Sequence, residues 1–294
     1  MARYRTPLRY PGGKQRLAPF IGDVLECNDL VGGHYAEPYA GGAGIALELL
    51  LSDRVSHVHL NDASVHLSAF WSTVVKRPDE LCRKIAVASL SVEEWKRHRE
   101  VVRHPEDHDE FDLGFSTFYL NRCNRSGILR GGVIGGLEQT GRWRIDARFP
   151  RNELIQRIEA IATKADCISV TNMDAEVFLC EHLSEHLPLD SLIYCDPPYY
   201  EHGERLYLNS YQPDDHRRLA RTIQTKLKQR WIVSYDSHPD VIAFYSERRH
   251  FAYDISYSAA RAYTGREVMI FSDTLELPIT SVLQALCEGL NAVA

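Results

Sequence analysis

The segment 193–199, Ile-Tyr-Cys-Asp-Pro-Pro-Tyr, constrains this chain more than any other stretch. Residues 191–195 are predicted to form a short buried strand, because apolar and aromatic residues are followed at once by a turn. Pro197 and Pro198 must end this strand, since proline cannot donate a ladder hydrogen bond. An acid, a free carbonyl and an aromatic ring are thereby expected at the carboxyl edge of an α/β sheet, where ligands bind.

Asp196, Pro197 and Tyr199 suit chemistry on an exocyclic aromatic amine. Such an amine is a poor nucleophile, because its lone pair is delocalised into the ring. A carboxylate and a carbonyl that each accept one N–H would turn the lone pair out of the ring plane, and an aromatic side chain can stack on the base. Asp-Pro-Pro-Tyr at 196–199 is the signature of the DNA amino-methyltransferases, which this sequence resembles.

Two glycine-containing segments precede this motif. Residues 9–14, Arg-Tyr-Pro-Gly-Gly-Lys, lead into an apolar helical run at 17–25. The glycines let the backbone approach a ligand closely and the lysine can reach an anionic group, although the spacing is not that of a Walker loop. Residues 34–44, His-Tyr-Ala-Glu-Pro-Tyr-Ala-Gly-Gly-Ala-Gly, predict a strand and a glycine loop before a helix at 45–51.

A second strand is predicted at 55–60 and ends at Asn61-Asp62. An acid at the end of the second strand is where the ribose hydroxyls of a nucleoside would be held. His57 and His59 alternate with apolar residues, so we interpret them as side chains on one face of a strand and expect no metal site.

A helical block interrupts the alternation of strands and helices. Helices are predicted at 65–75, 79–88 and 92–102, followed by a fourth whose aromatics at 111, 115, 118 and 119 have helical spacing and belong to the core. The block leads into residues 122–151, where seven arginines against Glu138 and Asp146 give a local charge of +5, in a chain of net charge −6. Residues 1–20 carry five basic residues and no acid. Two basic runs in an acidic protein predict one localised surface for a polyanion.

The alternation then resumes with a helix at 152–165, a strand at 167–170 and a helix at 174–183, which Asp174 is expected to cap. After the proline motif, the polar, tyrosine-rich stretch 200–213 is long enough to be a flap. A loop at 258–266 with Arg261 and Arg266 is a second candidate for a DNA-facing loop. The remaining elements are predicted as helices at 214–227, 239–245 and 280–290 and strands at 231–235, 251–257 and 267–271.

The composition is that of a soluble globular protein, with 44% apolar and 25% charged residues. A chain of 294 residues can form one large domain with an insertion, and no run approaches the length of a membrane span. The seven cysteines are dispersed without Cys-x-x-Cys pairs, so neither a zinc site nor a disulfide framework is expected. This pattern fits a cytoplasmic protein.

The ordered motifs resemble the Dam-like (D12 class, alpha-group) DNA N6-adenine methyltransferase family. The resemblance implies an α/β, Rossmann-like S-adenosylmethionine-dependent methyltransferase sheet formed by 1–63 and 152–294, with an inserted, mainly helical DNA-recognition domain at 64–151. It also implies transfer of a methyl group from S-adenosylmethionine to the N6 amine of a flipped adenine in duplex DNA. The implied catalytic residues are Asp196, Pro197, Pro198 and Tyr199; the cofactor-binding residues are Tyr10, Pro11, Gly12, Lys14, Glu37, Pro38, Tyr39, Gly41, Gly42, Gly44, Asp62, Asp174 and Asp196; the DNA-binding residues are Arg122, Asn124, Arg125, Arg130, Arg142 and Arg261.

The recognition segment departs from the family pattern. Arg125-Ser126 stands where Dam-like enzymes have an aromatic residue followed by asparagine, which argues against GATC specificity, while Arg130 matches a position that reads a base edge. Methylation of cytosine C5 is disfavoured, because it needs a Pro-Cys pair that this chain lacks. Methylation of RNA adenine or of cytosine N4, and a catalytically silent DNA-binding homologue, remain alternatives. A monomer or weak dimer without metal is expected.

Overall fold

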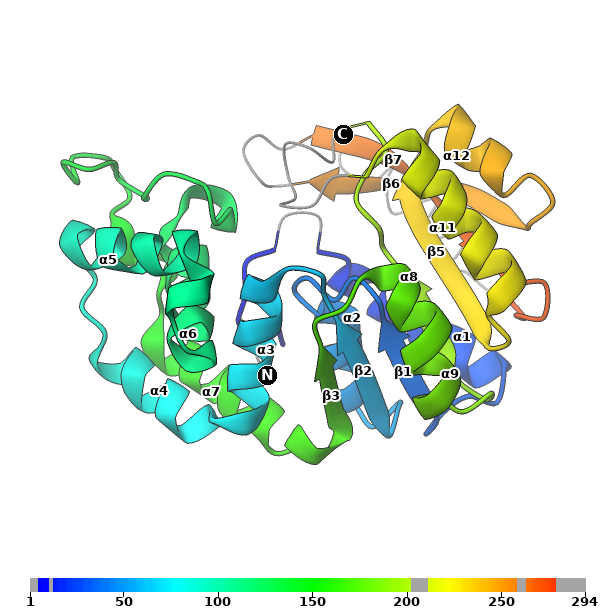
Figure 1. The fold of residues 1–294 in the computed structure, drawn as a ribbon, viewed down its shortest axis with the longest axis horizontal. Helices are drawn as coiled ribbons and strands as arrows, with labels where there is room; N and C mark the ends of the chain where they lie inside the picture. Colours follow the sequence, from blue (N-terminus) through cyan, green and yellow to red (C-terminus); the bar gives the residue numbers. More distant parts are fainter. Residues whose placement is uncertain (1–4, 11–12, 202–210, 258–262, 279–294) are drawn as a thin grey trace.

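The computed structural model describes residues 5–10, 13–201, 211–257 and 263–278. They form an α/β fold around a seven-stranded sheet of order β3-β2-β1-β4-β5-β7-β6 (Figure 1). The first five strands in this order are parallel, and β7 runs antiparallel to both β5 and β6. The predicted α/β class is confirmed, and the sheet is mostly parallel. The strands are β1 (His34–Glu37), β2 (His57–Asn61), β3 (Ile168–Thr171), β4 (Leu192–Cys195), β5 (Arg230–Asp236), β6 (His250–Tyr257) and β7 (Tyr263–Phe271).

The helices follow the predicted ranges within a few residues at each end. The α-helices are α1 (Ala18–Cys27), α2 (Gly44–Leu51), α3 (Val65–Lys76), α4 (Pro78–Val87), α5 (Val92–Arg103), α6 (Glu110–Cys123), α7 (Arg151–Ala162), α8 (Ala175–Val177), α9 (Leu183–His186), α11 (Pro213–Lys226) and α12 (Pro239–Phe244). A π-helical segment, η6 (Phe178–His182), joins α8 to α9, and 3-10 turns lie at η1 (Gln15–Leu17), η2 (Pro105–Asp107), η3 (Arg125–Gly127), η4 (Ile145–Arg148) and η5 (Ala165–Cys167).

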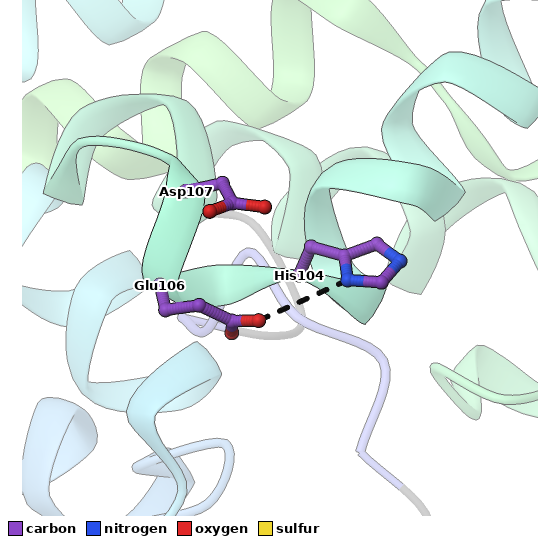
Figure 2. Close-up of side chains that lie close together, drawn as sticks. All are labelled: His104, Glu106 and Asp107. Atoms are coloured by element: carbon purple, nitrogen blue, oxygen red, sulfur yellow. Dashed lines mark ion pairs between the residues drawn. The ribbon is translucent and has the colours of Figure 1, made fainter.

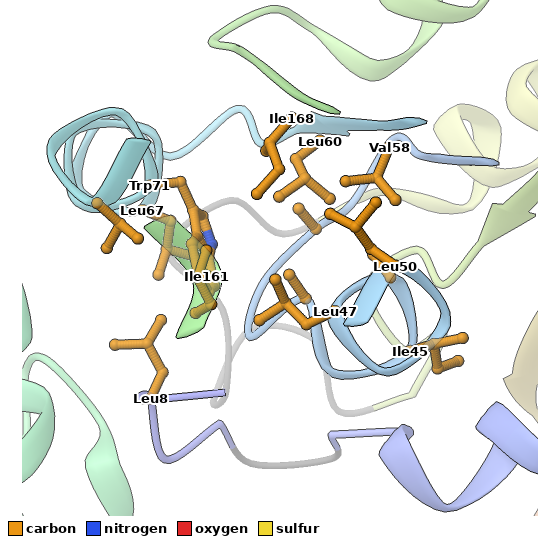
Figure 3. Packing of buried hydrophobic residues seen from close by; sticks show 14 of the residues in the cluster. Leu8, Ile45, Leu47, Leu50, Val58, Leu60, Leu67, Trp71, Ile161 and Ile168 are labelled. Carbon is orange, nitrogen blue, oxygen red and sulfur yellow. The ribbon is translucent and has the colours of Figure 1, made fainter. Parts of the chain in front are cut away.

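The two faces of the sheet are buried under different helices, because successive strand residues point to opposite faces. Along β4, Leu192 and Tyr194 join the core beneath α1, α2 and α7, whereas Ile193 and Cys195 join the core beneath α11 and α12. Figure 3 shows the first of these cores, in which side chains of α2 pack beside those of β2. This double burial explains why β4 is a short run of apolar and aromatic residues without polar alternation.

Five helices, α3 to α7, are inserted between β2 and β3. In Figure 1, α4, α5 and α6 lie to one side of the sheet, with α3 between them and the strands. Helix α6 packs against α3 and α5, and α4 packs against α7. The four aromatic residues that the sequence assigns to the core are buried, namely Phe111, Phe115, Phe118 and Tyr119.

Two predicted segments differ from the structure. The arginine-rich range 122–151 was expected to follow the helical block, but α6 continues to Cys123, so Arg122 lies in a helix. The second DNA-facing loop was expected at 258–266, but β7 begins at Tyr263, so Arg266 lies in a strand paired with Asp254. The antiparallel pairing of β6 with β7 explains this, because it extends both strands past their apolar parts. Arg261, the central part of the predicted flap and the predicted helix at 280–290 lie outside the described residues.

Within the described ranges, no helix is long and apolar enough to cross a membrane.

Candidate active site

The ends of three neighbouring strands are joined at the carboxyl edge of the sheet by one buried side chain. Asn61, at the end of β2, donates from its amide to the carbonyl oxygens of Pro38 and Met173 and accepts from Thr171 and the Met173 amide. Its own backbone carbonyl accepts from the amide of Ala40, at 2.8 Å. Asn61 therefore fixes the loops after β1 and β3 relative to each other, a role that the sequence did not reveal.

The glycine loop after β1 is held from two sides. The Gly41 amide donates to Asp62 Oδ2 at 2.9 Å, and the Gly41 carbonyl accepts from the indole of Trp71 at 2.9 Å. Gly41 has a φ of +47°, and a Cβ built there would lie 2.7 Å from the ring of Tyr10. Any side chain at position 41 would displace Tyr10, so the glycine is needed for close packing of the N-terminal segment. Gly42 lies similarly against Tyr10, and Gly44 opens α2.

Glu37 lies buried at the end of β1. Its Oε1 accepts from the Tyr35 hydroxyl and from the amide of Ala46 in α2, both at 3.1 Å. Burial raises the pKa of Glu37 to about 8, and the two hydrogen bonds only partly oppose this rise. Among the described residues no cation forms an ion pair with this carboxylate, which suits it to a cationic ligand group.

The other predicted cofactor residues near this edge are placed as follows. Asp62 accepts from the Ser64 and Gly41 amides, and burial raises its pKa to about 6. Pro38 is buried, and the hydroxyl of Tyr39 meets that of Tyr211 at 3.0 Å. Asp174 is exposed and caps α8 by accepting from the Glu176 and Val177 amides, as expected of a helix cap. Pro11 and Gly12 lie outside the described residues.

Asp196 follows β4 and is held through one oxygen. Its Oδ1 accepts from Lys14 Nζ at 3.0 Å and from the Ser234 hydroxyl at 2.8 Å. Both contacts fall on Oδ1, and Oδ2 accepts no hydrogen bond from the described part of the chain. Burial raises the pKa of Asp196, and the adjacent Lys14 ammonium opposes that rise.

The remaining residues of the motif are packed against the sheet. Pro197 and Pro198 are buried, and Cys195 faces the core, as expected for a transfer that uses no thiol. Tyr199 is also buried, and its hydroxyl donates to Glu267 Oε1 at 3.2 Å. The Lys14 ammonium lies 5.3 Å from the centroid of the Tyr199 ring. The structure thus brings Lys14 and the motif together, although they are 182 positions apart in sequence.

Ser234 and Glu267 are functional candidates that the sequence interpretation missed. Ser234 lies in β5 and Glu267 in β7, and both are fully buried. A signal existed for Glu267, because it is a lone acid at the start of the apolar run 268–271. A buried acid in an apolar strand needs partners, and here they are the groups of the active site.

Two of the predicted DNA-binding residues are buried, and their side chains donate hydrogen bonds to backbone carbonyl oxygens. The Arg122 guanidinium donates to the carbonyl oxygens of Arg148 and Pro7, and burial lowers its pKa to about 9. The amide of Asn124 donates to the carbonyls of Ile128 and Leu129, while its oxygen accepts from Trp95. The structure does not place these two side chains on the surface, so their observed contacts are structural.

Three further predicted DNA contacts are exposed. Arg125, Arg130 and Arg142 lie on the surface after α6, and Arg261 is outside the described residues. Trp143 was missed: its side chain is 61% exposed, with the Arg142 guanidinium 5.3 Å from its ring. The sequence signal was the triplet Arg-Trp-Arg at 142–144 in a glycine-punctuated loop.

One group of side chains in the described residues could gather around a metal ion (Figure 2). It consists of His104, Glu106 and Asp107, at and beside the 3-10 turn η2. All three are exposed, and the one ion pair among them, His104 with Glu106, spans 3.8 Å. Exposed acidic groups are common without an ion, so we assign no metal site here.

The fold and the site define an α/β enzyme that has a glycine loop after β1, an acid after β2 and a motif for chemistry on an amine after β4. The family model for D12 class N6 adenine-specific DNA methyltransferases matches residues 10–260. The chain belongs to this family and is an N6 adenine-specific DNA methyltransferase. This decides for adenine in DNA over the cytosine-N4 and RNA alternatives.

Individual relatives are distant. The type II methyltransferase M.MjaIII of Methanocaldococcus jannaschii is 23% identical over 233 residues, which are 73% of this chain and 77% of that protein. Among solved structures, the rRNA methyltransferase aviRa from Streptomyces viridochromogenes has a TM-score of 0.42 and 15% identity, covering 90% of this chain and 88% of that one.

Proposed function

We propose that this enzyme transfers a methyl group from S-adenosylmethionine to the N6 amine of an adenine that is flipped out of duplex DNA. The observation that carries the proposal is the hydrogen bonding of the Asp196 carboxylate. Its carboxylate is fixed through Oδ1 by Lys14 and Ser234, which leaves Oδ2 for a substrate N–H at the ligand-binding edge of the sheet.

The side chains at the carboxyl edge of the sheet suit the chemical groups of S-adenosylmethionine. Glu37 is a buried acid without an ion pair among the described residues and suits the ammonium of the cofactor, and Asp62 suits its ribose hydroxyls. The glycine loop permits close approach, and Tyr10, Pro11, Gly12, Pro38, Tyr39 and Asp174 complete the proposed site. When bound, the cofactor supplies an electrophilic methyl group on its sulfonium.

The protein groups then act on the amine. Asp196 Oδ2 and the Pro197 carbonyl accept the two N6 hydrogens and turn the lone pair out of the ring plane. The Tyr199 ring supports the flipped base, whose unstacking costs a few kcal/mol. Asp196 need not remove a proton beforehand, because the amine becomes acidic only as the methyl group arrives.

We assign DNA recognition to the inserted unit at 64–151. Exposed Arg125 and Arg142 would contact phosphates, Arg130 a base edge, and Trp143 a base or sugar face. Arg122 and Asn124 would support this surface from beneath through their backbone contacts. The type II relative suggests a restriction–modification role, and we expect a cytoplasmic protein that acts as a monomer or weak dimer.

The test is transfer of a tritiated methyl group to duplex DNA, to single-stranded DNA and to RNA, followed by nucleoside digestion. We expect label on N6-methyladenine from duplex DNA. Asp196→Ala should lower turnover by at least about 1000-fold, because it removes a group that acts on the reacting amine, while cofactor and DNA affinities stay within a few fold. Asp190→Ala, an exposed acid just before β4 at the opposite end of that strand, should stay fully active. Equal turnover by Asp196→Ala, or label on RNA alone, would contradict the proposal.

A further inference from the structure

Glu267 is a fully buried acid that belongs to none of the motifs described above. Its Oε1 accepts from Lys14 Nζ at 2.9 Å and from the Tyr199 hydroxyl at 3.2 Å, and its Oε2 accepts from the Tyr253 hydroxyl. Burying a carboxylate is costly unless it is paired and hydrogen-bonded. These three donors help to meet this need, and two of them, Lys14 and Tyr199, belong to the active site.

Lys14 is shared between Glu267 and Asp196. Its side chain is 3% exposed, and its Nζ lies 2.9 Å from Glu267 Oε1 and 3.0 Å from Asp196 Oδ1. Burial alone would lower the pKa of Lys14, but the two carboxylates raise it well above its usual value. The ammonium therefore stays charged and bridges β7 to the loop after β4.

We propose that Glu267 is a positioning residue of the methyl-transfer site. Glu267 holds Lys14 and Tyr199 in one arrangement, so that Asp196 presents its Oδ2 to the amine. This inference rests on the roles proposed above for Asp196 and Tyr199. Without Glu267, Lys14 would pair with Asp196 alone and could span both of its oxygens. Tyr199 would also lose the acceptor that orients its ring.

A purely structural role for Glu267 predicts different results. An ion pair that only ties β7 to the N-terminal segment would affect folding and cofactor binding together. A positioning role affects the reacting groups, since displacement of these groups by about 1 Å can cost 10²-fold in rate. The two roles are separated by comparing kcat with KM, and by the pH profile of kcat.

The pH profile is informative because Glu267 acts on Asp196 through charge. Burial raises the pKa of Asp196, Lys14 opposes the rise, and Glu267 adds to it. Among the described residues, the titratable groups that act on Asp196 are Lys14 before η1, Glu267 of β7, Tyr194 and Cys195 of β4 and Glu37 of β1. Removing the Glu267 charge should lower the pKa of Asp196, because the negative charge of Glu267 disfavours ionisation of Asp196. The acid limb of the profile should therefore shift to lower pH.

The test uses the full chain with Glu267→Gln, which keeps the size of the side chain and an oxygen acceptor but removes the charge. We expect kcat to fall by about 10- to 100-fold, with KM for DNA and for S-adenosylmethionine within about two-fold, and the acid limb to move to lower pH. Glu267→Asp keeps the charge at a shorter reach, so it should lose rate without moving that limb. Tyr253→Phe, a matched control that leaves the charge and both active-site donors in place, should lose less than about three-fold.

Two results would overturn the inference. One is a Glu267→Gln enzyme with unchanged kcat and an unchanged acid limb. The other is a loss of rate matched by an equal loss of thermal stability and cofactor binding in both Glu267 variants. Asp196→Ala run in parallel separates this failure from failure of the mechanism proposed above. An active Asp196→Ala enzyme refutes the proposed role of Asp196, whereas an inactive one beside a normal Glu267→Gln enzyme refutes only the role of Glu267.

Discussion

At the scale of single residues, Glu37 and Asp62 at the strand ends accept hydrogen bonds from backbone amides and remain available to a ligand. Asp62 holds Gly41, and Glu37 holds Ala46 at the start of α2. Because both bonds of Glu37 fall on Oε1, burial of the carboxylate remains incompletely compensated and its pKa rises to about 8. A cationic cofactor group would supply the missing compensation.

Glu37→Gln should therefore change how stability depends on pH. The native carboxyl binds its proton more tightly than in the unfolded chain, where the pKa is near 4.5. Its stabilising contribution is complete below about pH 4.5 and is lost as pH rises through about 8, by at most about 1.4 kcal/mol per pH unit. Urea unfolding at about pH 5.5 and about pH 7.5 should show this loss in the wild type and not in Glu37→Gln.

The exposed Glu138 provides the control, since Glu138→Gln should follow the wild type. Added S-adenosylmethionine should reduce the loss in the wild type, because its ammonium favours the carboxylate. If the unfolding free energies of the wild type and of Glu37→Gln change equally with pH, then Glu37 is not the source of this pH dependence.

The sequence predicted the motif residues but not their partners. Asp196 and Tyr199 stand in a recognisable signature, whereas Ser234 and Glu267 reach them only through the sheet order, which sequence spacing does not encode. Arg122 was predicted to be a surface cation because it lies in a basic run. It is buried because its guanidinium satisfies two backbone carbonyls, a use of arginine that charge patterns do not reveal.

At the scale of elements, apolar runs and breakers predicted the strands and helices well, because the central strand β4 is buried on both faces and most residues of β1, β2 and β5 are buried. The hairpin of β6 and β7 was predicted less well. Its polar part, such as the pair Asp254 and Arg266, is held by antiparallel pairing and not by burial, so hydrophobic patterns do not report it.

The structure also joins two elements that were treated as separate motifs. Asn121 of α6 accepts from the Arg9 amide and donates to the carbonyls of Arg9 and Gly127. The Arg9 guanidinium donates to the Asn124 carbonyl. The N-terminal segment before Lys14 is therefore docked on the turn that carries the exposed arginines.

Gly127→Ala should disrupt this docking. Gly127 has a φ of +77°, and a Cβ there would lie 2.2 Å from the Arg9 carbonyl oxygen. The backbone conformation alone costs about 1–2 kcal/mol for an L side chain, and the steric clash forces the two segments apart. We expect a lower free energy of unfolding and weaker DNA binding, measured by urea unfolding and fluorescence anisotropy.

Gly132→Ala is the matched control, because a Cβ at this glycine of the same loop would meet nothing within 4 Å. It should leave stability and DNA affinity close to the wild type. If both variants behave alike, the close approach of Arg9 to Gly127 does not organise the loop.

At the scale of the whole molecule, charge is distributed unevenly. The chain has a net charge of −6, yet residues 122–151 carry +5. Five of the seven arginines in this range are exposed, since Arg122 is buried and Arg151 is half-buried against the carbonyls of Ile85 and Ala88. The exposed ones are Arg125, Arg130, Arg142, Arg144 and Arg148. A polyanion should therefore be attracted to these exposed arginines in preference to the acidic parts of the surface.

Replacement of Arg125 and Arg142 by alanine should accordingly change the salt dependence of DNA binding. Removal of one phosphate-neutralising arginine reduces the magnitude of the slope of log K against log salt by about 0.9, so the slope of the double variant should be shallower by about 1.8. Arg217→Ala removes the same charge per site from an exposed arginine that has no proposed role in DNA binding. Arg217 belongs to α11, which in Figure 1 lies at the end of the sheet opposite to α4, α5 and α6. The slope of Arg217→Ala should match the wild type. If the slope falls equally in both proteins, net charge and not this face governs binding, and the DNA-recognition surface has to be sought elsewhere on the molecule.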